Sequence, residues 1–308
     1  MKLRVGTRRS PLALTQTRQS MRALAVHDAS LSYELVEIVT SGDRIQDRPL
    51  RESGGKGLFI KELDEALLDG RIDCAVHSLK DVPSELAPGI AIAAVLERAD
   101  PRDLLVTTDG RTLDELPADV LVGTTSLRRS CQLLARRPKA RVRMLRGNIE
   151  TRVKKLLAGE CAATFLAAAG IARLGLALAP AHGVVLDPSV FVPAPGQGAL
   201  AITARADDEA TIAALRPLDH PPSHAAIDAE RAFARAFGGG CHLPLAAFAE
   251  VTGTRVTLTG LLSSPDGQRV LREQAIGPAE HGAILGERLA RGFFDRGAAE
   301  IIAAAEPS

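Results

Sequence analysis

Three segments of the sequence place arginines just after a strand pattern and beside the start of a helix pattern, where anions bind. The clearest is GTTSLRRS, Gly123–Ser130, in which Thr124 and Ser126 come just before Arg128 and Arg129. If a strand ends at the glycine and a helix begins after the serine, backbone N–H groups and hydroxyls converge on one point. Guanidinium groups add paired hydrogen bonds to carboxylate or phosphate. This segment therefore predicts an anion-binding site.

Two further segments, LRGN at 145–148 and GTRRSPLAL at 6–14, repeat this arrangement after other strand patterns. Their basic and hydroxyl residues, with one arginine a turn beyond LRGN, are Arg8, Arg9, Ser10, Arg146 and Arg152. Ligands of open α/β sheets bind at the carboxyl ends of the strands, so we expect the three segments to face one cleft. A single arginine is as readily a solvated surface residue, but three at equivalent points favour a cleft.

The ligand of such a cleft carries several negative charges. Aromatic residues make up only 3% of the chain, with no Trp and one Tyr, which leaves little for stacking on nucleic-acid bases. None of the three segments has the G-x-x-x-x-G-K-[ST] pattern that cradles nucleotide phosphates. Segment 120–155 nevertheless holds eleven basic residues and one acid, a local anion-binding signature. A small polycarboxylate is the ligand class we expect.

A carboxylate follows a buried strand pattern in VHSLKDVP, Val76–Pro83. The strand runs out at Ser78, and Lys80 and Asp81 come before the proline that halts it. In a basic cleft, Asp81 could stabilise a cationic intermediate or relay a proton, which makes it the candidate catalytic residue. The structural alternative is a turn aspartate that caps its own backbone.

One cysteine stands apart from the other three. FGGGCHLP, 237–244, places Cys241 directly after three glycines, which are costly in helices and strands. We therefore expect this thiol on a loop, either where the chain turns tightly or where something bulky approaches the backbone. Cys74, Cys131 and Cys161 are far apart and show no C-x-x-C pairing, so the chain has no disulfide framework. Apolar surroundings predict that Cys74 and Cys161 act as small hydrophobic residues.

The sequence gives little support for a metal site or for the active site of a serine hydrolase. His220, His224, His242 and Cys241 are close in sequence, but two prolines separate the first two histidines, so these do not share a helix face. We expect no metal site. The chain also lacks the G-x-S-x-G segment of serine hydrolases.

The elements that position these residues read as two α/β lobes and a smaller domain. Strand patterns at 2–7, 33–40, 73–79 and 89–97 alternate with helices after Ser10–Pro11 and over 58–70, as in a mostly parallel sheet. A polar crossing at 97–103 leads to strands at 104–108, 120–125, 141–145 and 162–169 and helices at 126–137 and 148–160. Segment 192–203 could return the chain to the first lobe. A helix over 223–237, three antiparallel strands at 244–251, 255–264 and 269–277, and a closing helix over 279–304 follow.

Length and composition agree with this division. A chain of 308 residues suggests about two domains, with three small ones allowed, and 46% hydrophobic with 24% charged residues is typical of a globular protein. No apolar run approaches the roughly 18–20 residues that span a bilayer. The opening MKLRVGTRRSPLAL lacks the apolar stretch of a signal peptide, so we expect a cytoplasmic protein without membrane contact.

Seven motifs in order closely resemble the porphobilinogen deaminase family, whose members are also called hydroxymethylbilane synthases. They are TRRSPLAL, GGKGLFIKEL, VHSLKDVP, GTTSLRR, LRGN…TR, PAPGQGAL and GGGCHLP. Each is weak alone, but together they extend from Arg4 to the closing helix. The resemblance implies two lobes similar to type II periplasmic binding proteins and a small α+β domain. The implied boundaries are 1–99 with 200–216 for the first lobe, 100–199 for the second and 217–308 for the third domain.

The resemblance also implies a transferase of haem biosynthesis. In this family a loop cysteine, matched here by Cys241, holds a dipyrromethane cofactor through a thioether. Four porphobilinogen molecules lose ammonia and are joined head-to-tail, and hydroxymethylbilane is released. Asp81 matches the catalytic aspartate, which stabilises positive charge on pyrrole nitrogens. The family suggests a monomer, with neither nucleic acid nor membrane as partner.

Further roles carry over by position. The residues that match cofactor-binding positions are Ser78, Lys80, Thr124, Ser126, Arg128, Arg129, Arg146 and Arg152. Those that match substrate-binding positions are Arg8, Ser10, Gln16, Arg173 and Gln197, while Lys56 and Phe59 match a loop over the site. The chain departs from the family at Glu52, where a lysine is usual, with Arg51 beside it.

Two other function classes remain open from the sequence. A two-lobed binding protein could trap an anionic metabolite and release it unchanged, since similar folds serve both purposes. A nucleic-acid binder that uses segment 120–155 would show affinity that falls steeply with salt.

Overall fold

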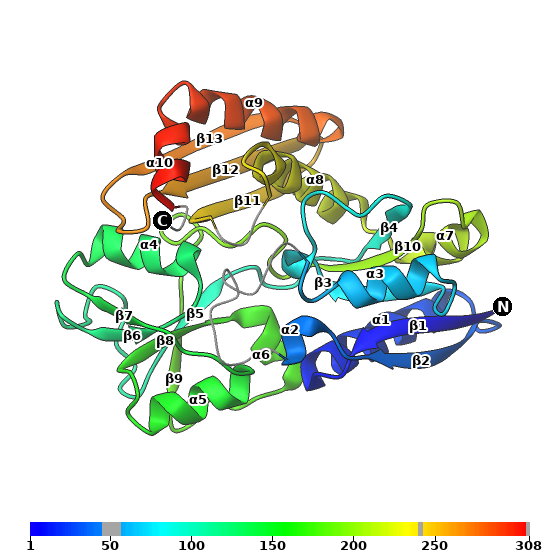
Figure 1. Cartoon of the computed structure of the whole chain (residues 1–308), viewed down its shortest axis with the longest axis horizontal. Coiled ribbons are helices and arrows are strands. Elements are labelled where there is room, and N and C mark those ends of the chain that lie inside the picture. The colour runs from blue at the N-terminus through cyan, green and yellow to red at the C-terminus, as the bar shows by residue number, and fades with distance from the viewer. Residues whose placement is uncertain (45–56, 240–242, 306–308) are drawn as a thin grey trace.

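The chain forms three sheets in the computed structural model, which describes residues 1–44, 57–239 and 243–305 (Figure 1). Two five-stranded sheets with flanking helices make two lobes, and a three-stranded sheet with its helices lies above them in that view. This confirms the expected fold class of two α/β lobes and a small α+β domain. None of the helices in the described ranges combines the length and apolarity that a bilayer crossing requires.

The sheet of the first lobe has the order β2-β1-β3-β10-β4. Strands β1, β2 and β3 are parallel, and β10 runs antiparallel between β3 and β4. As the sequence predicts, Ser10 caps the first helix by accepting a hydrogen bond from the N–H of Ala13. The elements are β1 (Lys2–Arg8), α1 (Pro11–His27), β2 (Ser32–Ile38), α2 (Ser41–Arg44), α3 (Lys61–Leu68), β3 (Cys74–Ser78), η2 (Leu79–Asp81), β4 (Ile90–Val95), β10 (Leu200–Arg205), α7 (Glu209–Leu215) and η3 (Arg216–Leu218).

The second lobe repeats this topology with the order β7-β6-β8-β5-β9. Here β5 is the antiparallel strand in the fourth place. Its elements are β5 (Asp103–Thr107), β6 (Leu121–Gly123), α4 (Leu127–Arg136), β7 (Arg141–Arg143), α5 (Ile149–Leu157), β8 (Ala163–Ala167), α6 (Ala168–Leu174) and β9 (His182–Val185). Sequence patterns missed α6 and β9, because α6 follows β8 without a break and the short β9 is largely exposed.

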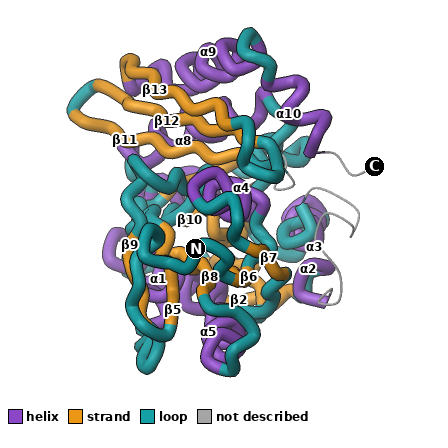
Figure 2. Tube along the Cα trace, turned by 90° about the vertical axis from the view of Figure 1, so that its left-hand side faces the viewer, coloured by secondary structure: helices purple, strands orange, loops and turns teal. Residues whose placement is uncertain are grey.

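The third domain packs helices against its antiparallel sheet, and its core draws residues from α8, α9 and α10 (Figure 2). Phe233 lies at the centre of this core, with its ring 5.0 Å from that of Phe237 and 5.2 Å from that of Phe293. The elements are α8 (Pro221–Ala236), β11 (Leu245–Thr252), β12 (Arg255–Ser263), β13 (Val270–Pro278), η4 (Ala279–His281), α9 (Gly282–Phe294) and α10 (Ala298–Ala305). The three antiparallel strands expected from the sequence are confirmed.

The single closing helix expected over 279–304 is wrong. The chain forms α9 and α10 as separate helices, with residues 295–297 between them. Gly297 takes a left-handed φ of +88°, a conformation that commonly ends helices. The apolar spacing continues across the break, so periodicity alone did not reveal it.

One buried carboxylate ties both crossings between the lobes to the third domain. Glu230 of α8 is fully buried and pairs with Arg98 of the first crossing at 2.6 Å. It also accepts hydrogen bonds from the backbone N–H of Gly196, on the second crossing, and of Ala249 in β11, each at 2.7 Å. The third domain is therefore fastened where the chain passes between the lobes.

The third domain also contacts the second lobe through the tip of the β12–β13 hairpin. A Cβ at Gly267 would lie 2.4 Å from the backbone nitrogen of Ala135 and 2.6 Å from the carbonyl oxygen of Cys131, and its φ is +73°. Both partners belong to α4, the helix that carries Arg128 and Arg129. Only a residue without a side chain allows this approach.

Gly267→Ala should therefore lower the free energy of unfolding by about 1–3 kcal/mol through overpacking, beyond the cost of a left-handed alanine. Gly253→Ala is the matched control, because Gly253 has a φ of +59° but no atom within 4 Å of the added Cβ. Urea unfolding of both variants measures the difference. Equal losses would show that the contact with α4 contributes nothing.

Candidate active site

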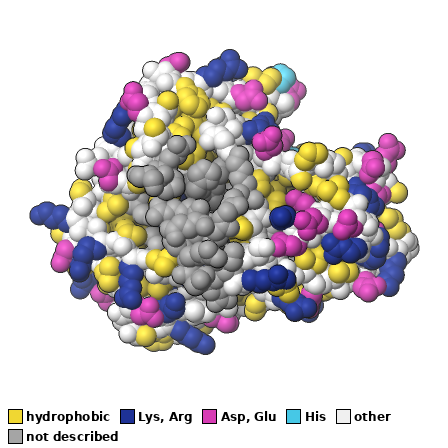
Figure 3. All heavy atoms as spheres, viewed as in Figure 1, with side chains coloured by type: hydrophobic (Ala, Val, Ile, Leu, Met, Phe, Trp, Pro, Cys, Tyr) yellow, Lys and Arg dark blue, Asp and Glu magenta, His cyan; other side chains and the backbone are white. Residues whose placement is uncertain are grey.

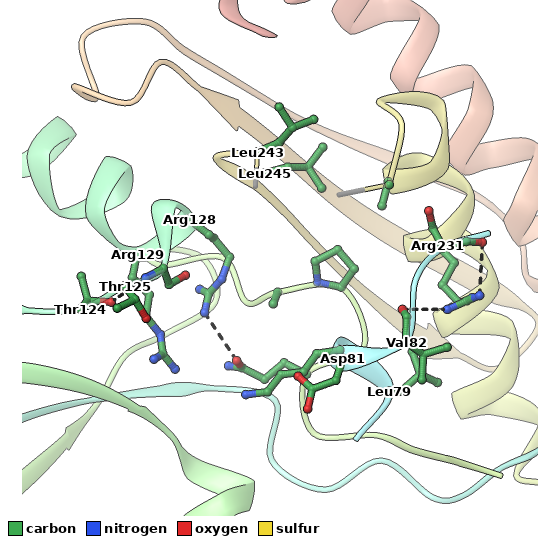
Figure 4. Close-up of a pocket in the computed structure, with 18 of the residues that line it drawn as sticks. Leu79, Asp81, Val82, Thr124, Thr125, Arg128, Arg129, Arg231, Leu243 and Leu245 are labelled. Atoms are coloured by element: carbon green, nitrogen blue, oxygen red, sulfur yellow. Dashed lines mark hydrogen bonds between the residues drawn. The ribbon is translucent and has the colours of Figure 1, made fainter. Parts of the chain in front are cut away.

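Two adjoining cavities lie between the lobes, with volumes of about 240 Å³ and about 690 Å³. The smaller one reaches up to the third domain, as Figure 4 shows, where Leu243 and Leu245 line it from above. The two cavities share a wall made of Lys80, Asp81, Thr125, Arg129 and Arg152.

Every candidate residue named in the sequence analysis that falls in the described ranges lines one cavity or the other. The smaller cavity has Lys80, Asp81, Thr124, Ser126, Arg128, Arg129, Arg152 and Gln197 in its wall. The larger one adds Arg8, Ser10, Gln16, Phe59, Ser78, Arg146 and Arg173. Cys241 and Lys56 lie outside the described residues.

The arginine pair at the start of α4 is held by a carboxylate that sequence reasoning missed. Asp103, the first residue of β5, is fully buried between Arg128 at 2.6 Å and Arg129 at 2.7 Å. Further N–H groups of these arginines donate to the carbonyls of Val192 and Phe165. Both guanidinium groups are thereby fixed in the cavity wall.

Burial alone would raise the pKa of Asp103, but the two guanidinium groups outweigh it and hold that pKa well below its usual range. The only sequence signal for Asp103 was its place at the end of the polar crossing at 97–103. Two positive charges against one negative charge leave the pair with a surplus that an anion can neutralise.

Lys80 and Arg152 add to this surplus. Burial and the nearby Arg129 guanidinium lower the pKa of Lys80 to about 8. Burial, with Arg129 and Arg146 close by, lowers the pKa of Arg152 to about 10. Cations that depress each other's pKa in a desolvated wall are stabilised when an anion binds between them.

Asp81 lies at the point where the first lobe meets this basic wall. It ends η2, the short turn that follows β3, and its carboxylate is 3.8 Å from Nη1 of Arg8. Arg8 in turn pairs with Asp43 and stacks 4.2 Å above the Phe59 ring. The carboxylate is one-third exposed, so it faces the cavities and remains accessible to a ligand.

The uncharged candidates are oriented by hydrogen bonds among themselves. The Gln16 amide donates to the Ser78 hydroxyl at 2.8 Å, and the two side chains lie together in the wall of the larger cavity. The Gln197 amide donates to the carbonyl of Pro101 at 2.7 Å and accepts a long bond from Arg128, which fixes that guanidinium further. Arg173 donates to the carbonyl of Gly198 at 2.8 Å.

The smaller cavity has two chemically different sides. Arg128 and Arg129 project from one side, Leu79 and Val82 lie on the opposite side beside Arg231, and Leu243 and Leu245 lie above (Figure 4). Such a space suits a flat apolar group that carries acidic arms.

The other three thiols, and the two candidate metal-binding histidines in the described ranges, do not line either cavity. Cys74, Cys131 and Cys161 are free and buried, as expected for Cys74 and Cys161. His220 caps α8 through its ring nitrogen, and His224 pairs with Asp219 at 2.7 Å. Within the described ranges no cluster of three His, Cys, Asp or Glu side chains could hold a metal ion.

Fold and site together define a two-lobed α/β protein with a cationic ligand cleft. Residues 3–213 match the family model described as porphobilinogen deaminase, dipyromethane cofactor binding domain. Residues 224–295 match the C-terminal domain of porphobilinogen deaminase.

Curated relatives agree over nearly the whole length. The chain is 47% identical to a porphobilinogen deaminase of Brevibacillus brevis, covering 98% of this chain and 97% of that one. It is 49% identical to a porphobilinogen deaminase of Chromobacterium violaceum, covering 99% of both. A solved substrate-binding protein of an amino acid ABC transporter is similar at 12% identity and a TM-score of 0.38, over 71% of this chain and 91% of that one.

The chain therefore belongs to the porphobilinogen deaminase family. It is a transferase of tetrapyrrole biosynthesis whose larger part is a dipyrromethane-binding domain. The family, the activity and the cofactor expected from the sequence are confirmed, and the alternative of a binding protein without catalysis gives way to them.

Asp103→Asn should lower the free energy of unfolding by about 3–5 kcal/mol at pH 7, because it leaves two buried guanidinium groups without their counter-charge. The folded-state pKa of Asp103 is lowered, so its contribution is present above the unfolded pKa of about 3.9 and is lost as the pH falls below it. The difference in free energy of unfolding between Asp103→Asn and wild type should accordingly become smaller below about pH 4.

Urea unfolding across this pH range measures the effect. Asp100→Asn is the control, because Asp100 pairs with the partly exposed Arg102 at 2.7 Å and such pairs contribute about 0–1 kcal/mol. A loss in Asp103→Asn no larger than in this control would contradict the buried pairing.

Proposed function

We propose that the chain deaminates porphobilinogen and joins four molecules head-to-tail on a dipyrromethane held through Cys241, releasing hydroxymethylbilane. The observation that carries this proposal is the place of Asp81 in the wall shared by both cavities, among Lys80, Arg129 and Arg152. Groups held in either cavity meet the same carboxylate and the same cations.

The residues of the smaller cavity fit a dipyrromethane. Its apolar side suits pyrrole rings, and its cationic side suits their acetate and propionate arms. When bound, this group supplies the carbon nucleophile to which the substrate is joined. The side chains that would hold its arms are Ser78, Lys80, Thr124, Ser126, Arg128, Arg129, Arg146 and Arg152. Gly239 and Leu243, described residues on either side of Cys241, both line this cavity and support that cysteine as the attachment point.

The larger cavity supplies a place for incoming substrate. Arg8, Ser10, Gln16 and Arg173 line it and would bind the substrate's carboxylates, and Gln197 would act from the smaller cavity by fixing Arg128. Phe59 and Lys56, which match the family's loop over the site, would cover the substrate. As ammonia leaves the substrate, positive charge develops on its pyrrole nitrogen. Asp81 would accept a hydrogen bond from that N–H and stabilise the charge.

The proposal includes the domain boundaries 1–99 with 200–216, 100–199 and 217–308. Membership of β10 in the first sheet supports the return segment, and the two family matches, which end at 213 and begin at 224, support the last boundary. We also propose a cytoplasmic monomer, which the free thiols and a site built from one chain support.

A role in nucleic-acid binding is not part of the proposal. The basic segment 120–155 sends Arg128 and Arg129 into the cavity wall, where they are buried against Asp103. On the face in Figure 3, Lys and Arg side chains are interspersed with acidic and apolar ones instead of forming one stripe. A protein that binds along the phosphate backbone of a nucleic acid needs a continuous basic surface.

Wild-type protein incubated with porphobilinogen should carry a covalent adduct of two pyrrole units, which Cys241→Ser should lack. Cys161→Ala is the control and should keep the adduct, because Cys161 is a buried thiol outside both cavities. Intact-protein mass spectrometry makes the measurement. An adduct that survives in Cys241→Ser would place the attachment elsewhere.

Asp81→Asn should keep the fold and the adduct but reduce kcat by roughly 100- to 1,000-fold, because the developing charge loses its partner. Glu85→Gln, an exposed acid four residues later, is the control and should retain wild-type turnover. Release of ammonia and formation of the tetrapyrrole are followed together. Wild-type turnover by Asp81→Asn would remove this residue from the mechanism.

A further inference from the structure

A buried arginine of the third domain contacts the backbone that immediately follows Asp81. Arg231 lies on α8, is 7% exposed and lines the smaller cavity. Its guanidinium donates to the carbonyl of Val82 at 3.4 Å and to that of Ser84 at 3.2 Å, as the dashed lines in Figure 4 show for this side chain. Val82 is the residue next to Asp81, so the arginine reaches the catalytic turn across a domain boundary.

The chemistry of these contacts is unusual for a buried arginine. In the described part of the chain its hydrogen-bond partners are backbone carbonyls instead of a carboxylate. Burial lowers the pKa of Arg231 to about 10, with the charge of Asp228 opposing that effect. Desolvating a guanidinium costs free energy, and two carbonyls at these distances compensate it only in part. Apolar side chains would join the two domains without this cost in desolvation free energy, so a purely structural contact does not need a buried arginine.

A second contact holds the same backbone segment. Gly239 lies three residues after the end of α8, and a Cβ there would lie 1.9 Å from the Ser84 hydroxyl oxygen. That hydroxyl is buried and has no hydrogen-bond partner in the described part of the chain. Residues 82–84 therefore contact the chain of the third domain at two points. Arg231 of α8 donates hydrogen bonds to two of their carbonyls, and the backbone of Gly239 packs closely against Ser84.

We propose that Arg231 is a positioning residue that fixes the distance between the catalytic carboxylate and the cofactor's attachment point. This inference rests on the proposed roles of Asp81 and Cys241. One guanidinium spans the carbonyls of Val82 and Ser84, two residues apart, a geometry that the compact lysine ammonium does not reproduce. Its helix ends three residues before Gly239, which lines the smaller cavity, so movement of α8 relative to residues 82–84 moves this part of the cavity wall relative to Asp81.

The expected signature is a loss of turnover without a loss of loading or of substrate affinity. Small displacements of reacting groups reduce rates by up to about 100-fold, so Arg231→Met should lower kcat roughly 10- to 100-fold. KM should stay within about twofold, because Arg231 touches none of the residues that line the larger cavity alone. Arg231→Lys keeps the charge but donates from a single nitrogen instead of two, so its kcat should fall between those of Arg231→Met and wild type.

Arg235→Met is the matched control. Arg235 lies one turn further along α8, is 48% exposed and pairs only loosely, at 3.8 Å, with Glu287. It should load and turn over as wild type does. Steady-state kinetics well below each variant's melting temperature gives kcat and KM, and intact-protein mass gives the fraction that carries the adduct.

The outcomes separate this inference from the function on which it rests. A loaded Arg231→Met with wild-type kcat overturns the positioning role, and so does a raised KM with kcat unchanged, which would make Arg231 a substrate-binding residue. Should Arg231→Met fail to fold, Arg231→Lys decides by the same two criteria. Wild-type protein without an adduct after exposure to porphobilinogen would instead refute the proposed attachment, whatever the kinetics of the variants.

Discussion

The site depends on positive charge that is kept inside the protein and only partly neutralised. Arg128 and Arg129 are both buried, and a single carboxylate, Asp103, lies between them. Without it, two desolvated guanidinium groups side by side would repel each other and cost several kcal/mol, roughly the stability margin of a whole domain. A second carboxylate between them would neutralise the arginine pair and weaken its attraction for an acidic ligand. One acid for two bases keeps the arginines in place and leaves a charge for the ligand.

The fold makes this arrangement possible by placing an antiparallel strand in the fourth position of each sheet. In the second lobe that strand is β5, whose first residue is Asp103. Because β5 lies beside β8, Asp103 reaches the start of α4, which follows the neighbouring strand β6. In the first lobe the corresponding strand is β10, which binds β3 just before the chain turns to Asp81. The turn that carries Asp81 and the helix that carries the arginine pair are thus supported by equivalent strands on opposite sides of the cleft.

Local motifs were predictable from the sequence, and their distant partners were not. Ser10, Thr124 and Arg128 lie in segments whose residue types predict a strand, a turn and a helix in that order. The structure places all three side chains in the cleft. Asp103 is 25 residues from Arg128, and Arg231 is 149 from Val82. Nothing in their own neighbourhoods signals the partner, because an aspartate at a strand start and an arginine in an amphipathic helix are ordinary. Resemblance to a family supplied the role of Cys241, which spacing alone left as a loop thiol.

The third domain contacts both crossings between the lobes, the helix of the arginine pair and the turn after Asp81. Glu230 joins the two crossings, Gly267 packs on the helix of the arginine pair, and Arg231 holds the turn after Asp81. Each contact uses a different kind of interaction: a buried ion pair, a steric fit on backbone, and hydrogen bonds to carbonyls. A two-lobed trap needs no such third body, since its lobes have only to close and reopen. A protein that builds a chain on a tether does need one, because both walls of the cleft must keep their place relative to the point of attachment.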